Sequence, residues 1–390
     1  MVNYPDGWTL STIDQIVDIG TGCRDTQDNI PYGRYKFFVR SPIVERIDVA
    51  DYDCEAVLTA GDGVGTGKVF HYVNGLFSAH QRVYVMNNFR NVLGKYFFYY
   101  FSKYFIYEVE KYTAKSSVDS VRRPMIAEME IPLPTIEEQQ RIIKAISAFD
   151  THIDNLTELI EKKKAIREGA LEDLISGKTR LSGFNSEWIS ISFDEYFTLL
   201  SNNTYSRDKL AEHGQVGNIH YGDILIKYSE IVTDEDEIPF LRPEITYSDN
   251  WLLHTNDVII ADTAEDETVG KAIQICEVSV PLVGGLHTIV CRPKFETAHG
   301  FLGLYTNSKS YHDQLLPHIT GIKVSSISKK AIKTTVLTIP SEIEEQSAIV
   351  GIITAMDKEI RSLEEERDKM IKIREGAMDD LLTGKVRLTD

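Results

Sequence analysis

An internal repeat at an offset of 207 residues constrains the fold of this 390-residue chain more than any other feature. At fixed register, 22 of 45 residue pairs are identical between residues 137–181 (EEQQRIIKAISAFDTHIDNLTELIEKKKAIREGALEDLISGKTRL) and residues 344–388 (EEQSAIVGIITAMDKEIRSLEEERDKMIKIREGAMDDLLTGKVRL). Fainter matches at the same offset pair His80 with His287 and Arg122-Arg123 with Lys329-Lys330. Two copies of one unit, each a variable body followed by a similar tail, therefore account for the whole chain.

The tails are expected to be long helices. Apolar residues recur in them at spacings of four and three, which is the pattern of a coiled-coil seam. The seam residues are Ile142, Ile146, Phe149, Ile153, Leu156 and Ile160 in the first tail, and Ile349, Ile353, Met356, Ile360 and Leu363 in the second. Each helix is expected to begin near Pro134 or Pro340, with acidic residues in its first turn, and to end at Gly177 or Gly384. About 38 residues at 1.5 Å each make a rod of roughly 55–60 Å.

The simplest way to bury two such seams is against each other, and the alternative is that each helix packs on its own body. The bodies are expected to be mixed α/β, because strand-like segments alternate with turns rich in Gly and Asn. Such segments are Tyr35–Val39, Arg82–Met86, Asp257–Ala261 and Thr288–Cys291. Periodicity does not decide whether the aromatic stretch Tyr96–Tyr107 is a helix or a buried strand, but core packing is favoured over an exposed base-stacking surface.

Charge argues against a polyanion as partner. The formal net charge is -17, from 42 basic and 59 acidic side chains. The excess is uneven: the net charge is -2 for residues 1–130, -1 for 131–183, -9 for 184–337 and -5 for 338–390. The acidic run Asp234–Glu237 contributes to the third value and is expected to be a solvated loop.

Several functional classes are disfavoured by the sequence. No apolar run is long enough to span a membrane and no secretory signal is recognisable, so a cytoplasmic protein is expected. The four cysteines lie far apart, which argues against zinc and disulfide frameworks. The glycine-rich turn Gly61–Lys68 lacks the P-loop spacing, although its backbone can approach a DNA backbone closely. No catalytic motif or metal-ligand pattern is present, so neither a catalytic site nor a bound metal is expected.

Polar clusters suited to nucleic acid occur in both bodies. Arg and Lys neutralise phosphates or bind guanine edges, whereas Gln and Ser bond adenine or phosphate, and a carboxylate can accept from the cytosine amino group. The candidates in the first body are Gly65, Thr66, Lys68, His80, Gln81, Arg82, Lys115, Ser116, Ser117, Arg122 and Arg123. Those in the second are Thr263, Glu265, Asp266, Lys271, His287, Lys323, Ser325, Ser326, Lys329 and Lys330. For any single one of them, a surface role without DNA contact is an equally good interpretation.

Taken together, the chain resembles the DNA-specificity subunit of Type I restriction-modification systems over essentially its full length. The resemblance is carried by the tail motifs IPLP…EEQQ at 131–140 and IP…EEQ at 339–346, and by the endings GKTRL at 177–181 and GKVRL at 384–388. The phrases FSAHQRV at 77–83 and GLHTIV at 285–290 support it. Each motif is moderately specific alone, and the doubled set is highly specific.

The resemblance implies an α+β fold with two mixed α/β target-recognition domains and two long antiparallel coiled-coil helices, related by an internal pseudo-two-fold repeat. The implied segments are a first target-recognition domain at 1–130, a central helical region at 131–183, a second target-recognition domain at 184–337 and a C-terminal helical region at 338–390. Each recognition domain is then expected to read one half of a bipartite site in the major groove of double-stranded DNA. The helices are expected to set the spacer between the halves.

The same resemblance implies a subunit without catalysis or a cofactor of its own. Two modification subunits are expected to bind it and to supply S-adenosylmethionine for adenine methylation, and restriction subunits can join the complex. Two other classes remain open from the residues alone. One is an acidic coiled-coil scaffold or DNA mimic without DNA specificity, and the other is an intrinsic methyltransferase or nuclease.

Overall fold

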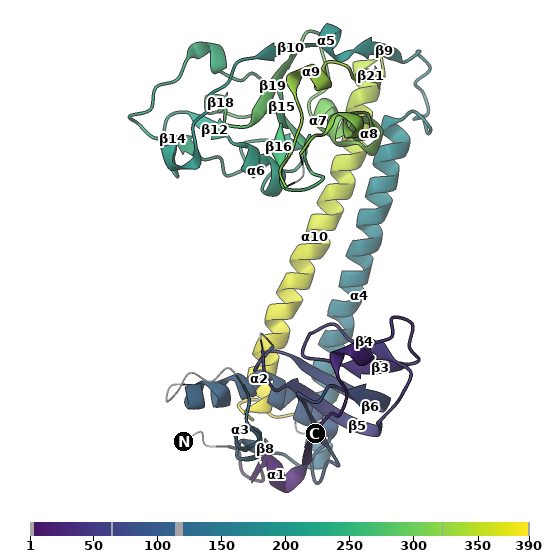
Figure 1. Cartoon of the computed structure of the whole chain (residues 1–390), viewed down its shortest axis with the longest axis vertical. Coiled ribbons are helices and arrows are strands. Elements are labelled where there is room, and N and C mark those ends of the chain that lie inside the picture. Colours follow the sequence, from purple (N-terminus) through teal and green to yellow (C-terminus); the bar gives the residue numbers. More distant parts are fainter. Residues whose placement is uncertain (1–3, 64, 114–119, 322, 389–390) are drawn as a thin grey trace. The chain divides into compact units, whose positions relative to one another are not determined.

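In the computed structural model, the chain forms two compact units (Figure 1). The structure describes residues 4–63, 65–113, 120–321 and 323–388. The first unit comprises Met1–Thr157 and Glu365–Asp390, and the second comprises Glu158–Glu364. Both units take part of each long helix, α4 (Ile136–Ile175) and α10 (Ile343–Leu382). The compact units therefore cut across the sequence segments, because each body folds together with portions of both tails.

A six-stranded sheet lies at the centre of the first unit. The strands of this unit are β1 (Thr9–Thr12), β2 (Asp18–Thr21), β3 (Tyr35–Phe38), β4 (Glu45–Ile47), β5 (Tyr52–Ala60), β6 (Phe70–Ala79), β7 (Val83–Asn87) and β8 (Glu130–Leu133). Its shorter helices are α1 (Ile13–Ile16), the 3-10 turn η1 (Thr26–Asp28), α2 (Gly94–Thr113) and α3 (Arg123–Ala127). The sheet order is β2-β7-β5-β6-β3-β4, with β5 antiparallel to β6 and β7. β1 and β8 form a separate pair, and β8 directly precedes α4 in the chain.

The aromatic stretch forms helix α2 and packs in the core of the first unit. The rings of Phe97 and Phe101 stack with centroids 5.5 Å apart, and those of Phe101 and Phe105 stack at 4.4 Å. Phe70 of β6 meets Phe101 edge-to-face. Since the side chains of Phe97, Phe101 and Phe105 are fully buried, the expected core role is confirmed.

The second unit contains two larger sheets. Its strands are β9 (Ile189–Ser192), β10 (Phe197–Leu200), β11 (Leu210–Ala211), β12 (Gly217–Ile219), β13 (Ile231–Val232), β14 (Phe240–Leu241), β15 (Val258–Ala261), β16 (Thr263–Ala264), β17 (Ala272–Ile275), β18 (Leu282–Gly284), β19 (Thr288–Pro293), β20 (Ser325–Ser326) and β21 (Val336–Ile339). Its shorter helices are α5 (Phe193–Tyr196), η2 (Arg207–Lys209), α6 (Tyr221–Ile226), η3 (Asp249–Trp251), α7 (Phe301–Asn307), α8 (Lys309–Leu315), η4 (Leu316–His318) and α9 (Lys329–Ile332). The sheet orders are β10-β19-β15-β17-β13 and β11-β14-β12-β18.

All four segments predicted as strands are strands, namely β3, β7, β15 and β19. In each unit the central strand pairs antiparallel with one strand at the same position in the sheet: β5 with β7, and β15 with β19. The pairs Ala60–Val83 and Ala261–Thr288 end the two ladders at the same place. The two bodies thus share one strand arrangement despite little sequence similarity.

Each long helix spans 40 residues and begins where the sequence predicts, just after Pro134 or Pro340. A buried glutamine fixes each start. Gln139 donates to the carbonyl of Pro134 at 3.0 Å, and Gln346 donates to the carbonyl of Pro340 at 2.9 Å. Both amide oxygens also accept from a backbone N–H of their own body, so the helix starts are tied to the bodies by satisfied buried hydrogen bonds.

Helices α4 and α10 run antiparallel within each unit (Figure 1). One ion pair joins them in each unit, and the residues of the two pairs are related by the repeat offset. In the second unit, Arg167 binds Asp357 at 2.9 Å. In the first unit, Arg374 binds Asp150 at 2.5 Å. Because Arg374 and Asp357 lie 207 positions after Arg167 and Asp150, one contact is made twice with the partners exchanged. This exchange confirms the pseudo-two-fold helix pairing.

The seam residues are buried in two different ways. Ile142 and Ile146 lie in the core of the first unit, and Ile349 and Ile353 in that of the second. Each core also holds the last turns of the other long helix. Leu156, Ile160 and Ile360 are buried outside these body cores, whereas Phe149, Ile153, Met356 and Leu363 are half-buried. The helices thus pack together as expected, and their first turns also pack on their own bodies.

Both helix ends depend on a glycine in the left-handed region. Gly177 has φ +70° and Gly384 has φ +73°. A Cβ on Gly384 would lie 2.5 Å from Pro5, whereas one on Gly177 would lie 3.3 Å from Trp188. We expect Gly384→Ala to lower the free energy of unfolding more than Gly177→Ala does. The Gly177→Ala variant should lose about 1 kcal/mol from backbone strain alone.

Urea unfolding of the two glycine variants measures this difference. Gly169→Ala is the matched control, because Gly169 lies inside α4 with no atom near its Cβ position. It is expected to stabilise the chain, since alanine is the better helix former. Equal losses of stability in Gly177→Ala and Gly384→Ala would contradict the role of Pro5.

Candidate nucleic-acid interface

In the first unit, three charged side chains meet where β5 ends and β7 begins. Asp62 follows β5 and receives a hydrogen bond from Arg40 at 2.8 Å and another from Arg82. Arg82 stands directly before β7 and is 62% exposed, whereas Asp62 is 19% exposed. Burial opposes ionisation of Asp62, but the two guanidinium groups outweigh it and lower the pKa of Asp62. We call Arg40, Asp62 and Arg82 the first strand-end cluster.

The glycine-rich turn lies beside this cluster. A Cβ on Gly65 would lie 2.5 Å from the carbonyl oxygen of Arg40, so only glycine fits there. Thr66 donates its hydroxyl to the carbonyl of Gly63 at 2.7 Å and closes the turn. Lys68 is exposed. The turn therefore packs its backbone against Arg40 and carries an exposed lysine, a combination suited to contact with a phosphate backbone.

The other predicted residues of the first body have different surroundings. Gln81 is exposed and donates to Asp25 at 3.1 Å. His80 is 4% exposed, and its Nδ1 accepts from the backbone N–H of Arg82 at 3.0 Å. Its ring therefore holds the turn in shape rather than presenting a polar atom to the surface. Arg122 and Arg123 are exposed at the start of α3, and Lys115, Ser116 and Ser117 lie outside the described residues.

The second unit has a corresponding cluster between β15 and β19. Asp262 follows β15, and its Oδ1 lies 3.2 Å from Nδ1 of His287. Thr263 donates to the same oxygen at 2.8 Å. The ring of Tyr221 meets the His287 ring edge-to-face at 5.2 Å. We call Asp262, Thr263 and His287 the second strand-end cluster.

The backbone places Arg82 and His287 at equivalent positions. The N–H of Gly61 donates to the carbonyl of Arg82 at 2.8 Å, and the N–H of Asp262 donates to that of His287 at 3.1 Å. Both residues directly precede the strand paired with the central strand. The 207-residue offset pairs His287 with His80, so the structure corrects this correspondence to Arg82.

Several other residues predicted for the second body adjoin its cluster. Strand β16 pairs with β20, which places Thr263 opposite Ser326 and Ala264 opposite Ser325. Exposed residues of the predicted set include Glu265, Asp266, Lys323, Lys329 and Lys330. Hydrogen bonds from Thr268 lower the pKa of Asp266 and use its Oδ1. The structure thus brings together segments that are about 60 residues apart in the sequence.

Lys271 is the exception. Its ammonium donates to the carbonyls of Leu225 at 3.2 Å and Tyr228 at 2.9 Å. Burial lowers the pKa of Lys271. Its side chain therefore satisfies the carboxyl end of α6 and is directed into the protein.

Sequence reasoning did not select Arg40, Asp62, Asp262 or Tyr221. Asp62 was visible only as part of a failed P-loop pattern, and Asp262 only as the neighbour of Thr263. Carboxylates are unusual candidates for a surface that approaches phosphates. Here Asp62 binds Arg40 and Arg82, and Asp262 binds His287, contacts that become apparent only when the strand ends are paired.

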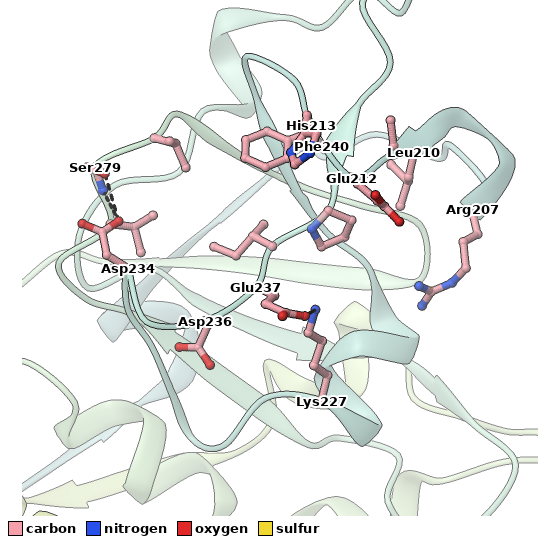
Figure 2. Close-up of a pocket in the computed structure, with 15 residues that line it drawn as sticks. Arg207, Leu210, Glu212, His213, Lys227, Asp234, Asp236, Glu237, Phe240 and Ser279 are labelled. Carbon is pink, nitrogen blue, oxygen red and sulfur yellow. Dashed lines mark hydrogen bonds and ion pairs between the residues drawn. The ribbon is translucent and has the colours of Figure 1, made fainter.

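A cavity of about 940 Å³ lies elsewhere in the second unit, between β11, β14 and the loop at 234–239 (Figure 2). Glu212, Asp234, Asp236 and Glu237 line it, against the cations Arg207 and Lys227. Figure 2 shows Asp234 bound to Ser279 and Lys227 reaching Glu237. Its carboxylates outnumber its cations, so this cavity is unsuited to a phosphate backbone. Within the acidic run, Asp234 therefore stabilises a local loop through its hydrogen bond from Ser279.

Among the residues that the structure describes, no group of three or more His, Cys, Asp or Glu side chains is placed to hold a metal ion. Within the same part of the chain, no helix combines the length and the apolar character needed to cross a membrane.

Comparisons with known proteins agree with this arrangement. The family model described as "Type I restriction modification DNA specificity domain" matches residues 5–165 and again residues 185–372. The MjaVIII type I restriction enzyme specificity subunit of Methanocaldococcus jannaschii is 21% identical over 353 residues, covering 85% of this chain and 79% of the relative.

Two solved structures share the fold. The S subunit of a type I restriction-modification system from M. genitalium superposes with a TM-score of 0.57 at 18% identity, covering 97% of this chain and 96% of that one. A chain from a structural study of the assembly of a type I R-M system superposes with a TM-score of 0.62 at 15% identity, covering 98% and 100%. With two family-model matches that follow its own internal repeat, the chain belongs to the Type I restriction-modification DNA specificity family.

Proposed function

We propose that this specificity subunit reads a bipartite DNA sequence, with each body contacting one half-site in the major groove. The observation that carries the proposal is the duplication of the strand-end cluster at equivalent backbone positions. A side chain that directly precedes the strand paired with the central strand, and that is supported by a neighbouring carboxylate, is suited to base contacts. Because the two clusters hold different side chains, the two half-sites are expected to differ.

The helices have two roles in this proposal. Their paired ion contacts and buried first turns fix each body to both helices, which lets the helices set the unspecified spacer, as dimeric readers fix half-site spacing. The helices would also dock two modification subunits. Those partners, rather than this chain, would bind S-adenosylmethionine and methylate adenine, and restriction subunits would join the same complex.

Nuclease protection tests the proposal. The chain, assembled with its modification subunits, is expected to protect one bipartite sequence selected from a pool of randomised duplexes. Mapping of methylated adenines in cells with and without the chain should return the same sequence. Protection without any sequence preference at low salt would refute it. If the chain instead competes with a labelled duplex for the DNA site of a DNA-binding enzyme, and does not bind that duplex itself, the result would indicate a DNA mimic.

The charge of -17 leads to a quantitative expectation for DNA affinity. The chain alone should bind even its own site weakly, because its net charge repels phosphates and only local clusters attract them. Assembly with the modification subunits should increase the affinity by orders of magnitude, as they add basic surface. It should also make the slope of log K against log salt steeper, by about 0.9 per added phosphate contact.

Fluorescence anisotropy from about 50 to 200 mM salt measures both values, with the scrambled duplex as control. Equal salt slopes for the isolated chain and the complex would contradict the assignment of most phosphate contacts to the partners.

A further inference from the structure

We propose that Arg82 and His287 are equivalent base-reading side chains, the first for guanine and the second for a base that offers an exocyclic amino group. The inference rests on the proposed function. It goes further by assigning, in each unit, the residue that discriminates between bases and the kind of base that it selects. It also assigns Asp62 and Asp262 as positioning residues, because each holds its reader without being the reader itself.

The two positions are equivalent in two backbone hydrogen bonds and in their place before a strand. The residue after the central strand donates its N–H to the reader's carbonyl: Gly61 to Arg82 and Asp262 to His287. That same residue accepts an N–H from a third segment, at 2.7 Å from Val121 and at 2.9 Å from Ile327. The reader also precedes the same strand of each sheet.

The third segments are themselves lined with predicted DNA-binding residues. Arg122 and Arg123 follow Val121, whereas Ser325 and Ser326 precede Ile327. The strand ends therefore meet in one three-segment site in each unit.

The chemistry of the first position favours guanine. One Nη of Arg82 is held by Asp62, and the side chain remains 62% exposed. A guanidinium has five N–H donors in a planar fork, so donors remain after the bond to the carboxylate. Guanine presents two acceptors, O6 and N7, in the major groove, which is the pattern that an arginine fork matches. Because Asp62 fixes the plane of the fork in advance, less side-chain entropy is lost on binding.

The second position presents different chemistry. The hydrogen bonds of the His287 ring to described residues all use Nδ1, toward Asp262 at 3.2 Å and Thr263 at 3.3 Å. A carboxylate can only accept, so Nδ1 carries the hydrogen, and in the neutral form of the ring this tautomer leaves Nε2 as an acceptor. An acceptor in the major groove selects the amino group of adenine or cytosine. The side chain of His287 is 46% exposed, and the ring is held from one side by Tyr221.

The backbone of His287 is strained. Its φ of +54° lies in the left-handed region, which residues with a side chain rarely adopt. Strain of this kind persists where the surroundings hold the residue, and it is found disproportionately at binding sites. Here it turns the imidazole toward Asp262 at the strand end.

Selection from randomised duplexes by the complete complex tests the inference. For Arg82→Gln, we expect discrimination in favour of guanine at one position of one half-site to fall about 5- to 150-fold, with the other half-site unchanged. Arg82→Lys keeps the charge but loses the fork, so it should lose the same discrimination. Asp62→Asn should reduce discrimination at that same position. Arg90→Gln is the matched control, because Arg90 pairs with Asp18 at the opposite end of β7, and it should behave as the unmodified complex.

The second reader is tested by His287→Gly, since glycine adopts the left-handed conformation without strain. The preference for adenine or cytosine at one position of the other half-site should be lost. His254→Gln is the control, because His254 is exposed near the opposite end of β15.

The outcomes separate the two proposals. If the unmodified complex shows no base preference at any position, the proposed function itself fails. If it selects a bipartite site but Arg82→Gln either leaves every preference intact or weakens all sequences equally, Arg82 is not a base reader and the inference is overturned. The inference also fails if both readers act on the same half-site.

Discussion

Arg180→Ala is expected to destabilise the second unit by more than the loss of an exposed ion pair does, although Arg180 itself lies near the surface. Arg180 binds Glu345 through two hydrogen bonds of 3.1 and 2.6 Å. The side chain of Glu345 is only 1% exposed, at the start of α10. Removing the guanidinium leaves this carboxylate buried without its counter-charge, which costs far more than losing an exposed ion pair. Urea unfolding measures the loss.

A double variant distinguishes the lost pair from other effects of the substitution. Arg180→Met with Glu345→Leu replaces both partners by apolar groups, and we expect it to recover most of the stability lost in the single variant. Lys162→Ala removes an exposed pair with Glu158, both 66% exposed, and should cost much less stability than Arg180→Ala. A double variant as unstable as Arg180→Ala would show that the buried carboxylate is not the cause.

The equivalent ion pair in the first unit is expected to make the stability of that unit depend on pH. Arg387 binds Glu138 at 3.0 and 2.7 Å and lowers the pKa of Glu138. A carboxyl whose pKa is lower in the folded state stabilises folding above its unfolded value of about 4.3, and this contribution is lost as pH falls through the folded value. Arg387→Ala should therefore make the first unit less stable at pH 7 and less sensitive to acid below about pH 5.

Ile146→Ala and Ile353→Ala are expected to cost about 2–5 kcal/mol each, because both side chains are fully buried. The two residues are 207 positions apart, so each variant makes the same cavity in a different unit. Ile146 packs in the core of the first unit, and Ile353 in that of the second. Hydrogen exchange read by mass spectrometry resolves the two units, since each supplies its own peptides. Ile146→Ala should reduce protection mainly in the first unit, and Ile353→Ala mainly in the second.

Thr354→Ala is the matched control for the cavity variants, because Thr354 is exposed on the same turn as Ile353. It should change stability by less than about 0.5 kcal/mol. Equal loss of protection in both units, from either cavity variant, would contradict their division into separate compact units.

The long helices could be predicted closely from the sequence because their signals are local. Apolar spacing, an acidic first turn and a terminal glycine all act within a few residues, and the helices begin and end within three residues of those signals. The packing of Ile146 and Ile353 on their bodies could not be predicted, because it depends on contacts remote in the sequence. The aromatic stretch of α2 was ambiguous for another reason. A segment that is apolar on nearly all of its faces shows no helical periodicity in its sequence.

The candidate site was only partly predictable, because loop lengths differ between the bodies. The offset is 207 in the tails, 205 between Arg82 and His287, and 201 between Gly61 and Asp262. A fixed offset therefore paired His287 with the buried His80 rather than with Arg82. Pairing the strands of each sheet removes this error, since the hydrogen-bond register does not depend on loop length.

The division of the chain into units also sets an order of folding during synthesis. The second unit is one continuous stretch, Glu158–Glu364, so every residue it needs has been translated before the end of α10 appears. The first unit is discontinuous. Its core includes Met378, Leu381 and Leu382, and its buried Glu138 needs Arg387. Domains fold as units once their residues are available, so the body made first on the ribosome is completed last. Until then it exposes the apolar surface that the end of α10 covers in the folded unit.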